Sequence, residues 1–309
     1  FVDKAEFTIK HTKKMKETVL VSGGAGYIGT HTTVELIEAG YDVVIVDNLS
    51  NSEMEAVEGV RKITGVNVPF EQVDCTDKEA LGRVFDQYKF NSIIHFAASK
   101  AVGESVEKPL LYYRNNLQSL ITILELMRDK GVRNIVFSSS CTVYGQPDVL
   151  PVTEQTPRQP ATSPYGNTKQ ICEDILRDTV HAYPELFGIA LRYFNPIGAH
   201  PSALIGELPK GVPMNLVPFI TQTAAGIREC LSVFGDDYDT PDGSAIRDYI
   251  DVNDLARAHV VAVDRMVGGK SKSNYEYFNI GTGRGLSVLE LIAEFEKATG
   301  VKLNYKIVG

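Results

Sequence analysis

SGGAGYIG, Ser22 to Gly29, joins an apolar strand-like segment at 18–21 to a helix-like run. Its glycines, Gly23, Gly26 and Gly29, form the spacing G-x-x-G-x-x-G, a variant of the dinucleotide-binding fingerprint. In that fingerprint glycines permit a tight turn, a close approach of the backbone to a pyrophosphate and close packing of helix on strand. The N–H groups at the start of the helix favour a phosphate. This stretch therefore predicts a dinucleotide site.

The next apolar run, DVVIV at 42–46, reads as a second strand and ends at Asp47. An acid roughly 20 residues after the glycines is where NAD-binding units hold the ribose hydroxyls. No arginine directly follows Asp47 to favour a 2′-phosphate, so we expect NAD rather than NADP. Strand-like and helix-like runs continue to alternate, which predicts an α/β fold with a Rossmann-type doubly wound parallel sheet.

The same reading gives a set of expected elements and domains. Helices are expected at 53–63, 78–88 and 110–130, and strands at 69–73, 92–96, 134–137 and 188–193, the last completing the main sheet. After Asn195, repeated prolines and a helix at 216–229 indicate a smaller C-terminal α/β substrate domain. We predict an extension outside the fold at 1–14, an NAD-binding domain at 15–194 and a mainly substrate-binding domain at 195–309. Segments near 245–280 are expected to return to the first domain, and the C-terminus looks truncated.

Composition excludes several classes of protein. A net charge of -8 argues against a nucleic acid or an anionic membrane as partner. The cysteines, Cys75, Cys141, Cys172 and Cys230, have no metal-ligand spacing and fit a reducing cytoplasm. No apolar run reaches the roughly 20 residues of a membrane helix. The acidic loop at 236–243 fails the calcium-loop spacing, so we expect a solvated turn and no metal.

Tyr165 and Lys169 lie four residues apart on a predicted helix that Ser163 caps and Pro164 begins. This spacing puts both side chains on one face. An ammonium group beside a phenol would lower the phenol's pKa and make Tyr165 a general base. Tyr-x-x-x-Lys also occurs by chance, but here it follows a dinucleotide fingerprint.

Ser138, Ser139 and Ser140 lie where a predicted parallel strand ends, and ligands bind outside such ends. We assign a role in proton transfer to Ser140 and a purely structural role to Ser139. Among the histidines, His95 reads as a core residue of its strand, and none is assigned a catalytic role.

Longer motifs show a resemblance to a known family. They include GGAGYIG (23–29), VDNLSNS (46–52), HFAASKAVGES (95–105), FSSSCTVYG (137–145), SPYGNTK (163–169), LRYFNPIGAHPS (191–202) and IRDYIDVNDLA (246–256). On these segments the chain resembles the extended short-chain dehydrogenase/reductases, and within them the UDP-glucose 4-epimerase (UDP-galactose 4-epimerase) family.

The resemblance implies reversible interconversion of UDP-galactose and UDP-glucose with tightly bound NAD. Hydride would leave sugar C4 and return to the other face of a 4-keto sugar. Tyr165 would take the proton of the 4-hydroxyl with help from Ser140, and Lys169 would tune Tyr165 and hold the nicotinamide ribose. The resemblance also implies a homodimer through the helices at 110–130 and 164–182.

Residues of the two binding sites follow from the resemblance. The cofactor positions are Gly23, Gly26, Tyr27, Ile28, Gly29, Asp47, Asn48, Asn51, Ser52, Asp74, Cys75, Phe96, Ala97, Ala98, Lys100, Asn115, Ser138, Tyr165, Lys169 and Tyr193. The UDP-sugar positions are Ser140, Tyr165, Asn195, Asn215, Leu216, Phe234 and Arg247. A guanidinium suits a diphosphate, but Arg247 could instead pair with Asp248 or Asp251, and Phe234 could be core.

The chain departs from the family pattern in three places. Ala98-Ser99 replaces Gly-Leu, Cys141 replaces an alanine, and the sequence ends before an expected Arg-Arg-x-Gly-Asp segment. Acceptance of N-acetylated sugars therefore stays open. Alternatives are a 4,6-dehydratase, disfavoured because Cys141-Thr142-Val143 supplies no carboxylate, a dehydrogenase that releases NADH, and a non-catalytic NAD-binding protein.

Overall fold

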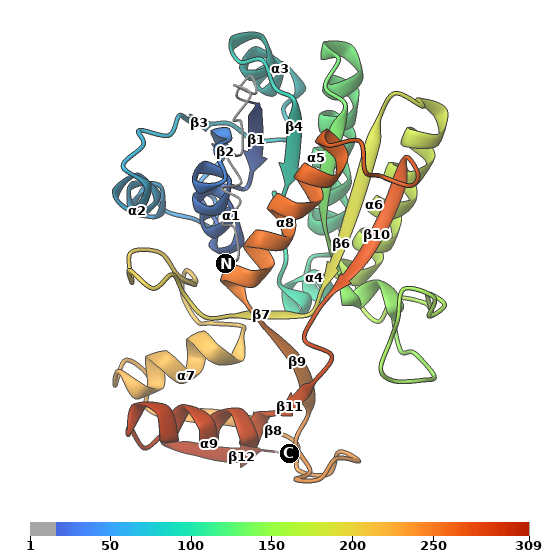
Figure 1. Ribbon diagram of the computed structural model, residues 1–309. Coiled ribbons are helices and arrows are strands. Elements are labelled where there is room, and N and C mark those ends of the chain that lie inside the picture. The colour runs from blue at the N-terminus through green and yellow to red at the C-terminus, as the bar shows by residue number, and fades with distance from the viewer. Residues whose placement is uncertain (1–16, 309) are drawn as a thin grey trace, which may run out of the picture.

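The computed structural model describes residues 17–308 and is built around a parallel sheet (Figure 1). Seven strands form this sheet within the described part of the chain. Their spatial order is β10 (Tyr275–Ile280), β6 (Phe187–Tyr193), β5 (Asn134–Ser140), β4 (Ser92–His95), β1 (Thr18–Ser22), β2 (Asp42–Asp47) and β3 (Phe70–Gln72). The order reverses direction between β1 and β4, so the crevice at the carboxyl ends of these strands is the expected ligand site. This is the Rossmann-type architecture that the sequence predicts.

Helices cover both faces of the sheet, as a parallel sheet requires (Figure 1). One apolar core lies under α1 (Tyr27–Glu38), α2 (Met54–Thr64) and α8 (Val252–Val267). The other lies under α3 (Lys78–Gln87), α5 (Pro109–Lys130) and α6 (Pro164–Ala182). Strand side chains alternate between the two cores; Val136, for example, belongs to the first and Phe137 to the second.

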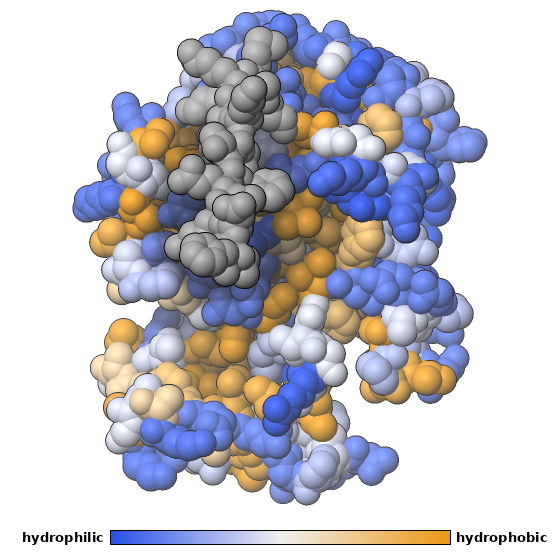
Figure 2. All heavy atoms as spheres, in the orientation of Figure 1, coloured by the Kyte–Doolittle hydropathy of each residue, from blue (hydrophilic) through white to orange (hydrophobic). Residues whose placement is uncertain are grey.

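A smaller part lies beyond the carboxyl edge of the main sheet, at the bottom of Figure 1. It contains the strand pair β12–β8 and the set β11–β9–β7. Its elements are β7 (Asn195–Ile197), α7 (Leu216–Ala224), β8 (Leu231–Phe234), β9 (Ile246–Asp251), β11 (Gly285–Ser287), α9 (Val288–Thr299) and β12 (Tyr305–Val308). A third apolar core joins α7, α9 and β8. On the face seen in Figure 2, apolar residues gather between this part and the main sheet.

Three expectations about these elements need correction. The strand ending at Tyr193 does not complete the main sheet, because β10 pairs with it in parallel at the edge. The predicted helix at 216–229 ends at Ala224, since Gly226 adopts a φ of 72°, which a helix cannot continue through. The strand predicted to end at Phe137 runs on to Ser140 and so includes the serine cluster.

Two shorter helices lie near the carboxyl edge of the sheet. They are α4 (Val102–Glu107) and the 3₁₀ turn η1 (Cys141–Tyr144). Across residues 17–308, no helix is both long and apolar enough to cross a membrane. The same residues hold no group of three or more His, Cys, Asp or Glu side chains placed to bind a metal. The predicted extension at 1–14 lies outside the described residues.

Candidate active site

The glycine turn after β1 has no room for side chains. Gly23 adopts a φ of 70°, and a Cβ there would lie 2.7 Å from the backbone nitrogen of Ala97. A Cβ at Gly29 would collide with the carbonyl oxygen of Gly23. Gly26 is the N-cap of α1 and has no side chain to bond the free N–H groups of the first turn. The turn is therefore a bare backbone cradle of the kind that a pyrophosphate requires, which fits NAD.

Asp47 ends β2 beside this cradle and is buried. Its carboxylate accepts hydrogen bonds from Ala25 N at 3.1 Å, Leu49 N at 2.9 Å and Ser52 Oγ at 2.8 Å. A carboxylate offers roughly four acceptor positions, so one remains for a ribose hydroxyl. Ser52, which the sequence places with the cofactor, thus helps to orient Asp47.

A second polar group lies beyond β3. Asn48 Nδ2 donates to Asp74 Oδ2 at 3.0 Å, and Thr76 donates to the other carboxylate oxygen. Burial acts to raise the pKa of Asp74, but the hydrogen bonds from Thr76 and Asn48 outweigh it and lower that pKa. Burial raises the pKa of the neighbouring Cys75 thiol to about 12, so it stays neutral. The structure therefore brings Asn48 and Asp74 together, with Cys75 next to them in the chain.

Ser140, Tyr165 and Lys169 converge where β5 meets α6. Ser163 caps α6 by accepting from Gly166 N at 3.1 Å, which places Tyr165 in the first turn. Ser140 makes a hydrogen bond that favours the Tyr165 phenolate. Lys169 Nζ lies 5.8 Å from the centre of the Tyr165 ring. The three predicted catalytic side chains thus form one group.

The predicted pKa shift of Tyr165 is wrong for the protein alone. Burial raises the pKa of Tyr165 to about 12, and the Ser140 hydrogen bond only partly opposes this. The ammonium group of Lys169 donates to the carbonyl oxygen of Ser138, at 2.7 Å. Burial also lowers the pKa of Lys169 to about 8. Formation of the phenolate therefore has to overcome the cost of burying its charge.

An aromatic cluster lies next to this group, in the core under α8. The hydroxyls of Ser138 and Tyr193 share a very short hydrogen bond. His259 of α8 lies 5.9 Å from the Tyr193 ring and 4.7 Å from the Phe96 ring, between centroids. Burial lowers the pKa of His259 to about 4, so the imidazole is neutral. Sequence reasoning missed His259, since nothing local links it to the cofactor positions.

The loop after β4 carries further predicted cofactor residues. Asn115 Nδ2 donates to Ser99 Oγ at 3.0 Å, and Lys100 forms an ion pair with Glu207 at 3.7 Å. The adjacent Asn116, which sequence reasoning also missed, donates to Ser99 O and to Thr168 Oγ1, both at 3.0 Å. A polar amide among the apolar residues of this helix could have pointed to Asn116 from the sequence. The Asn116 side chain connects the loop after β4 to α5 and α6.

Other predicted cofactor positions have simpler surroundings. Tyr27 OH donates to the carbonyl oxygen of Gly198 at 2.7 Å and so bridges the glycine turn to the segment after β7. Ile28 packs against the first core. The backbone of Ala97 faces Gly23, and Asn51 is exposed. Ala98 lies in the same partly buried loop after β4.

Besides Ser140 and Tyr165, the predicted UDP-sugar residues come from the smaller part. Asn215 is the N-cap of α7, directly before Leu216, and donates to Glu207 Oε1 at 2.6 Å. Phe234 ends β8 and is 73% exposed, so the alternative that it belongs to the core is wrong. Asn195 lies on β7, which pairs with β9.

Arg247 lies on β9 and makes a hydrogen bond to the carbonyl oxygen of Ile246. The alternative of an ion pair with a nearby acid is not observed among residues 17–308. Asp248 accepts from Thr282 and Gly283, and Asp251 caps α8 through Asn253 N. Most N–H groups of the Arg247 guanidinium are therefore available to donate to a ligand.

Comparisons with known proteins agree with this site. The NAD dependent epimerase/dehydratase family matches residues 19–281. UDP-glucose 4-epimerase 2 of Arabidopsis thaliana is 51% identical over 298 residues, covering 96% of this chain and 84% of the relative. The human UDP-glucose 4-epimerase is 50% identical over 300 residues, covering 95% and 85%. The crystal structure of the Bifidobacterium longum UDP-glucose 4-epimerase, in complex with NAD+ and UDP, superposes with a TM-score of 0.90 at 50% identity, covering 94% of this chain and 86% of the other. The chain therefore belongs to the NAD dependent epimerase/dehydratase family and, within it, to the UDP-glucose 4-epimerases.

Proposed function

We propose that this protein interconverts UDP-galactose and UDP-glucose at sugar C4, with Tyr165, Lys169 and Ser140 as the catalytic residues. The convergence of these side chains at the carboxyl edge of the sheet that carries the glycine cradle is the observation that supports it. Close relatives bear the name of this activity. The cradle would hold NAD, which when bound would supply the acceptor and donor for the C4 hydride.

In this proposal the protein's own residues move a proton and orient the reacting groups. Tyr165 takes the proton of the sugar 4-hydroxyl as a general base, and Ser140 holds that hydroxyl by hydrogen bonding. The raised pKa of Tyr165 suits a group that must also return the proton, provided that positive charge at the site lowers it during reaction. Lys169 contributes its charge and positions the nicotinamide ribose.

Binding is divided between the two parts of the molecule. Residues 15–194 bind NAD, with Asp47, Asn48 and Asp74 on the adenosine side. Residues 195–309 mainly bind the UDP-sugar, and Arg247 neutralises its diphosphate as a bidentate donor. Segments near 245–280 belong partly with the first domain, because α8 and β10 pack with the main sheet.

A homodimer and a cytoplasmic location complete the proposal. The groove between α5 and α6 is lined by apolar and charged side chains, including Ile121, Leu124 and Tyr183. Pairing of two copies through this face would bury that groove. Light scattering of the wild type and Ile121→Arg tests it, since a dimer that uses this face dissociates in the variant. Free cysteines fit a reducing compartment.

The decisive experiment incubates the protein with UDP-galactose, with and without added NAD, and separates the UDP-sugars by chromatography. UDP-glucose should form without net NADH. Tyr165→Phe should lose at least roughly 100-fold in rate because its general base is gone. Tyr88→Phe, which loses a surface hydroxyl bonded to Glu71, is the matched control and should keep full activity. Accumulating NADH would instead indicate a dehydrogenase.

A further inference from the structure

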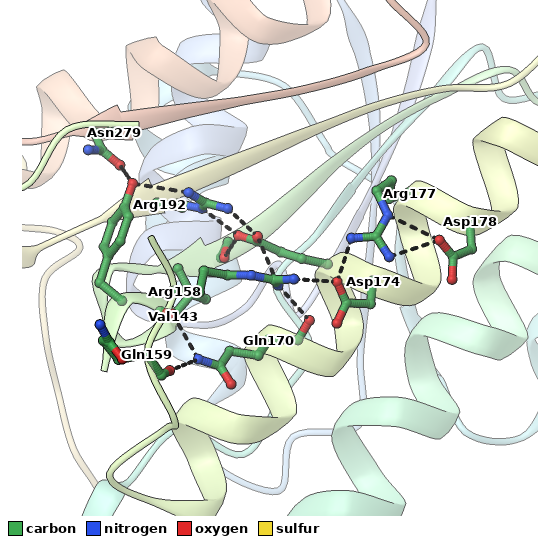
Figure 3. Close-up of polar contacts among 12 residues, drawn as sticks. Val143, Arg158, Gln159, Gln170, Asp174, Arg177, Asp178, Arg192 and Asn279 are labelled. Carbon is green, nitrogen blue, oxygen red and sulfur yellow. Dashed lines mark hydrogen bonds and ion pairs between the residues drawn. The ribbon is translucent and has the colours of Figure 1, made fainter. Parts of the chain in front are cut away.

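A buried ion pair lies one helical turn beyond Lys169. Glu173 of α6 is 2% exposed and Arg192 of β6 is 4% exposed. Arg192 Nε donates to Glu173 Oε1 at 2.9 Å and Nη2 donates to Oε2 at 2.6 Å, a bidentate fork (Figure 3). Such a pair costs desolvation energy and is weak support for stability by itself. Its position behind the catalytic group calls for another explanation.

Ser139 connects this pair to the catalytic strand. Its Oγ donates to Glu173 Oε1 at 2.5 Å, and Ser139 is directly opposite Arg192 in the pairing of β5 with β6. Side chains alternate along a strand, so Ser138 and Ser140 point to the opposite face. The sequence predicts a purely structural role for Ser139, and in the structure its hydroxyl makes a specific contact with Glu173. We call Ser139, Glu173 and Arg192 the Glu173 clamp.

The clamp and Lys169 hold neighbouring residues of β5 from the same helix. Lys169 Nζ donates to the carbonyl oxygen of Ser138, which belongs to the peptide bond that joins Ser138 to Ser139. Glu173, four residues further along α6, holds the Ser139 side chain. Two points on α6 are therefore fastened to two adjacent points on β5, immediately before Ser140.

Two tyrosines, Tyr144 and Tyr277, also contact the Arg192 guanidinium. Its Nη1 donates to Tyr144 OH at 3.0 Å, and Tyr144 OH donates to Asn279 Oδ1 at 2.7 Å (Figure 3). The guanidinium also stacks over the Tyr277 ring, 4.1 Å from its centre. Tyr144 ends the turn η1 that follows Ser140. The clamp thus holds the chain on both sides of Ser140.

The negative charge of Glu173 also acts on Lys169. The charged or titratable groups that face Lys169 are Cys172 and Glu173 of its own helix, Tyr165 one turn before it, and His95 of β4. Burial lowers the pKa of Lys169, whereas a negative charge on Cys172 or Glu173 would raise it. Burial keeps the His95 imidazole and the Cys172 thiol neutral. Glu173 is therefore the anion that helps Lys169 keep its charge.

We propose that the Glu173 clamp is a positioning device for the reaction, which holds Lys169 and Ser140 in place against Tyr165. The inference deepens the proposed function and rests on the roles proposed there for these three residues. The clamp residues are buried, so each acts through the strand end or through Lys169.

Ser139→Ala is the first test, because it deletes one hydroxyl and leaves the ion pair intact. With the NAD-bound protein and UDP-galactose, kcat should fall roughly tenfold, the cost of a small misplacement of reacting groups. The KM should stay within about twofold, since the UDP site is untouched. Thr122→Ala is the matched control: it also removes a wholly buried hydroxyl, on α5, and should keep the wild-type kcat.

Glu173→Gln is the second test and separates charge from geometry. The amide keeps an acceptor oxygen for Ser139 but loses the negative charge, so the pKa of Lys169 should fall further. The alkaline limb of the kcat–pH profile should move to lower pH, whereas in Ser139→Ala it should not move. Glu276→Gln is the control, because Glu276 makes a similar bidentate pair with Arg265 on β10 and α8.

A measurement without turnover makes the test independent of activity. NMR titration of labelled lysines, with the Lys169 signal assigned by Lys169→Met, should show a lower Lys169 pKa in Glu173→Gln than in the wild type. Wild-type kcat in folded Ser139→Ala, with an unchanged Lys169 pKa in Glu173→Gln, would overturn the inference and leave the proposed function standing. Full activity in Tyr165→Phe would instead overturn the proposed function, and the titration would still decide the electrostatic part of the clamp.

Discussion

The ammonium group of Lys169 donates a 2.7 Å hydrogen bond to the carbonyl oxygen of Ser138, inside the protein. Burial there lowers the pKa of Lys169 from 10.5 to about 8. Between these values the unfolded chain binds the proton and the folded protein does not, so stability rises with pH through this window. Without NAD, the wild type should therefore gain stability relative to Lys169→Met as the pH rises from 8 to 10.5. The full gain is at most about 3 kcal/mol at 1.36 kcal/mol for each pKa unit.

Urea unfolding of both proteins at several pH values in this window checks the expectation. Groups other than Lys169 titrate in both proteins, so their contributions cancel in the difference. A difference in unfolding free energy that stays constant with pH would contradict the burial of an ammonium group at this position.

Sequence alone predicts those parts of the site that local spacing determines. The glycine turn and the four-residue step from Tyr165 to Lys169 each lie within a single short segment, whose geometry follows from the helix and the turn. The Glu173–Arg192 pair could not be predicted in this way, because it forms only when α6 packs on β6. The pKa of Tyr165 was predicted in the wrong direction for a related reason. A pattern shows which charges are near in sequence, whereas burial depends on the whole fold.

The fold shows the same limit. The sequence predicts a doubly wound sheet and a return of segments near 245–280 to it, but nothing local shows that β10 pairs with β6 at the edge. His259 reaches Phe96 by the same return, since α8 directly precedes β10 in the order of elements. A strand such as β10 could pair with the edge of either sheet. Which edge it joins depends on the whole fold and cannot be predicted from the residues of the strand alone.

Gly29→Ala should abolish NAD binding and destabilise the protein. The new Cβ would collide with the carbonyl oxygen of Gly23 and would lie 2.7 Å from the Gly24 Cα, so the turn must open. NAD released from the purified protein by denaturation and measured by absorbance should drop below one tenth of the wild-type amount. Gly82→Ala is the control on α3, where the nearest atom lies 3.6 Å away. It should retain NAD and gain up to about 1 kcal/mol from better helix propensity. Normal NAD content in Gly29→Ala would show that the cradle is not the pyrophosphate site.

Arg247→Met should weaken binding of the UDP-sugar more than it slows the reaction. Within residues 17–308 the guanidinium donates only to the carbonyl oxygen of Ile246, so little internal structure is lost with it. Loss of a charge-assisted, bidentate contact to a diphosphate should raise the KM for UDP-galactose roughly tenfold or more, with kcat changed less. Arg257→Met, on the exposed side of α8, is the control and should leave both constants unchanged. A normal KM in Arg247→Met would remove this residue from the diphosphate site.

His259 should make the protein sensitive to acid. Burial lowers the pKa of this imidazole from 6.5 to about 4, with partial opposition from its hydrogen bond to the Leu255 carbonyl. Between pH 6.5 and about 4 the imidazole is protonated in the unfolded chain but neutral in the folded protein. The free energy of unfolding therefore decreases as the pH falls through this range. Over that window the wild type should lose about 3 kcal/mol more than His259→Phe, which cannot titrate. Parallel urea-unfolding curves at several pH values measure the difference. Equal losses would mean that His259 is protonated in the folded protein, and the neutral packing of its ring against Phe96 would then be wrong.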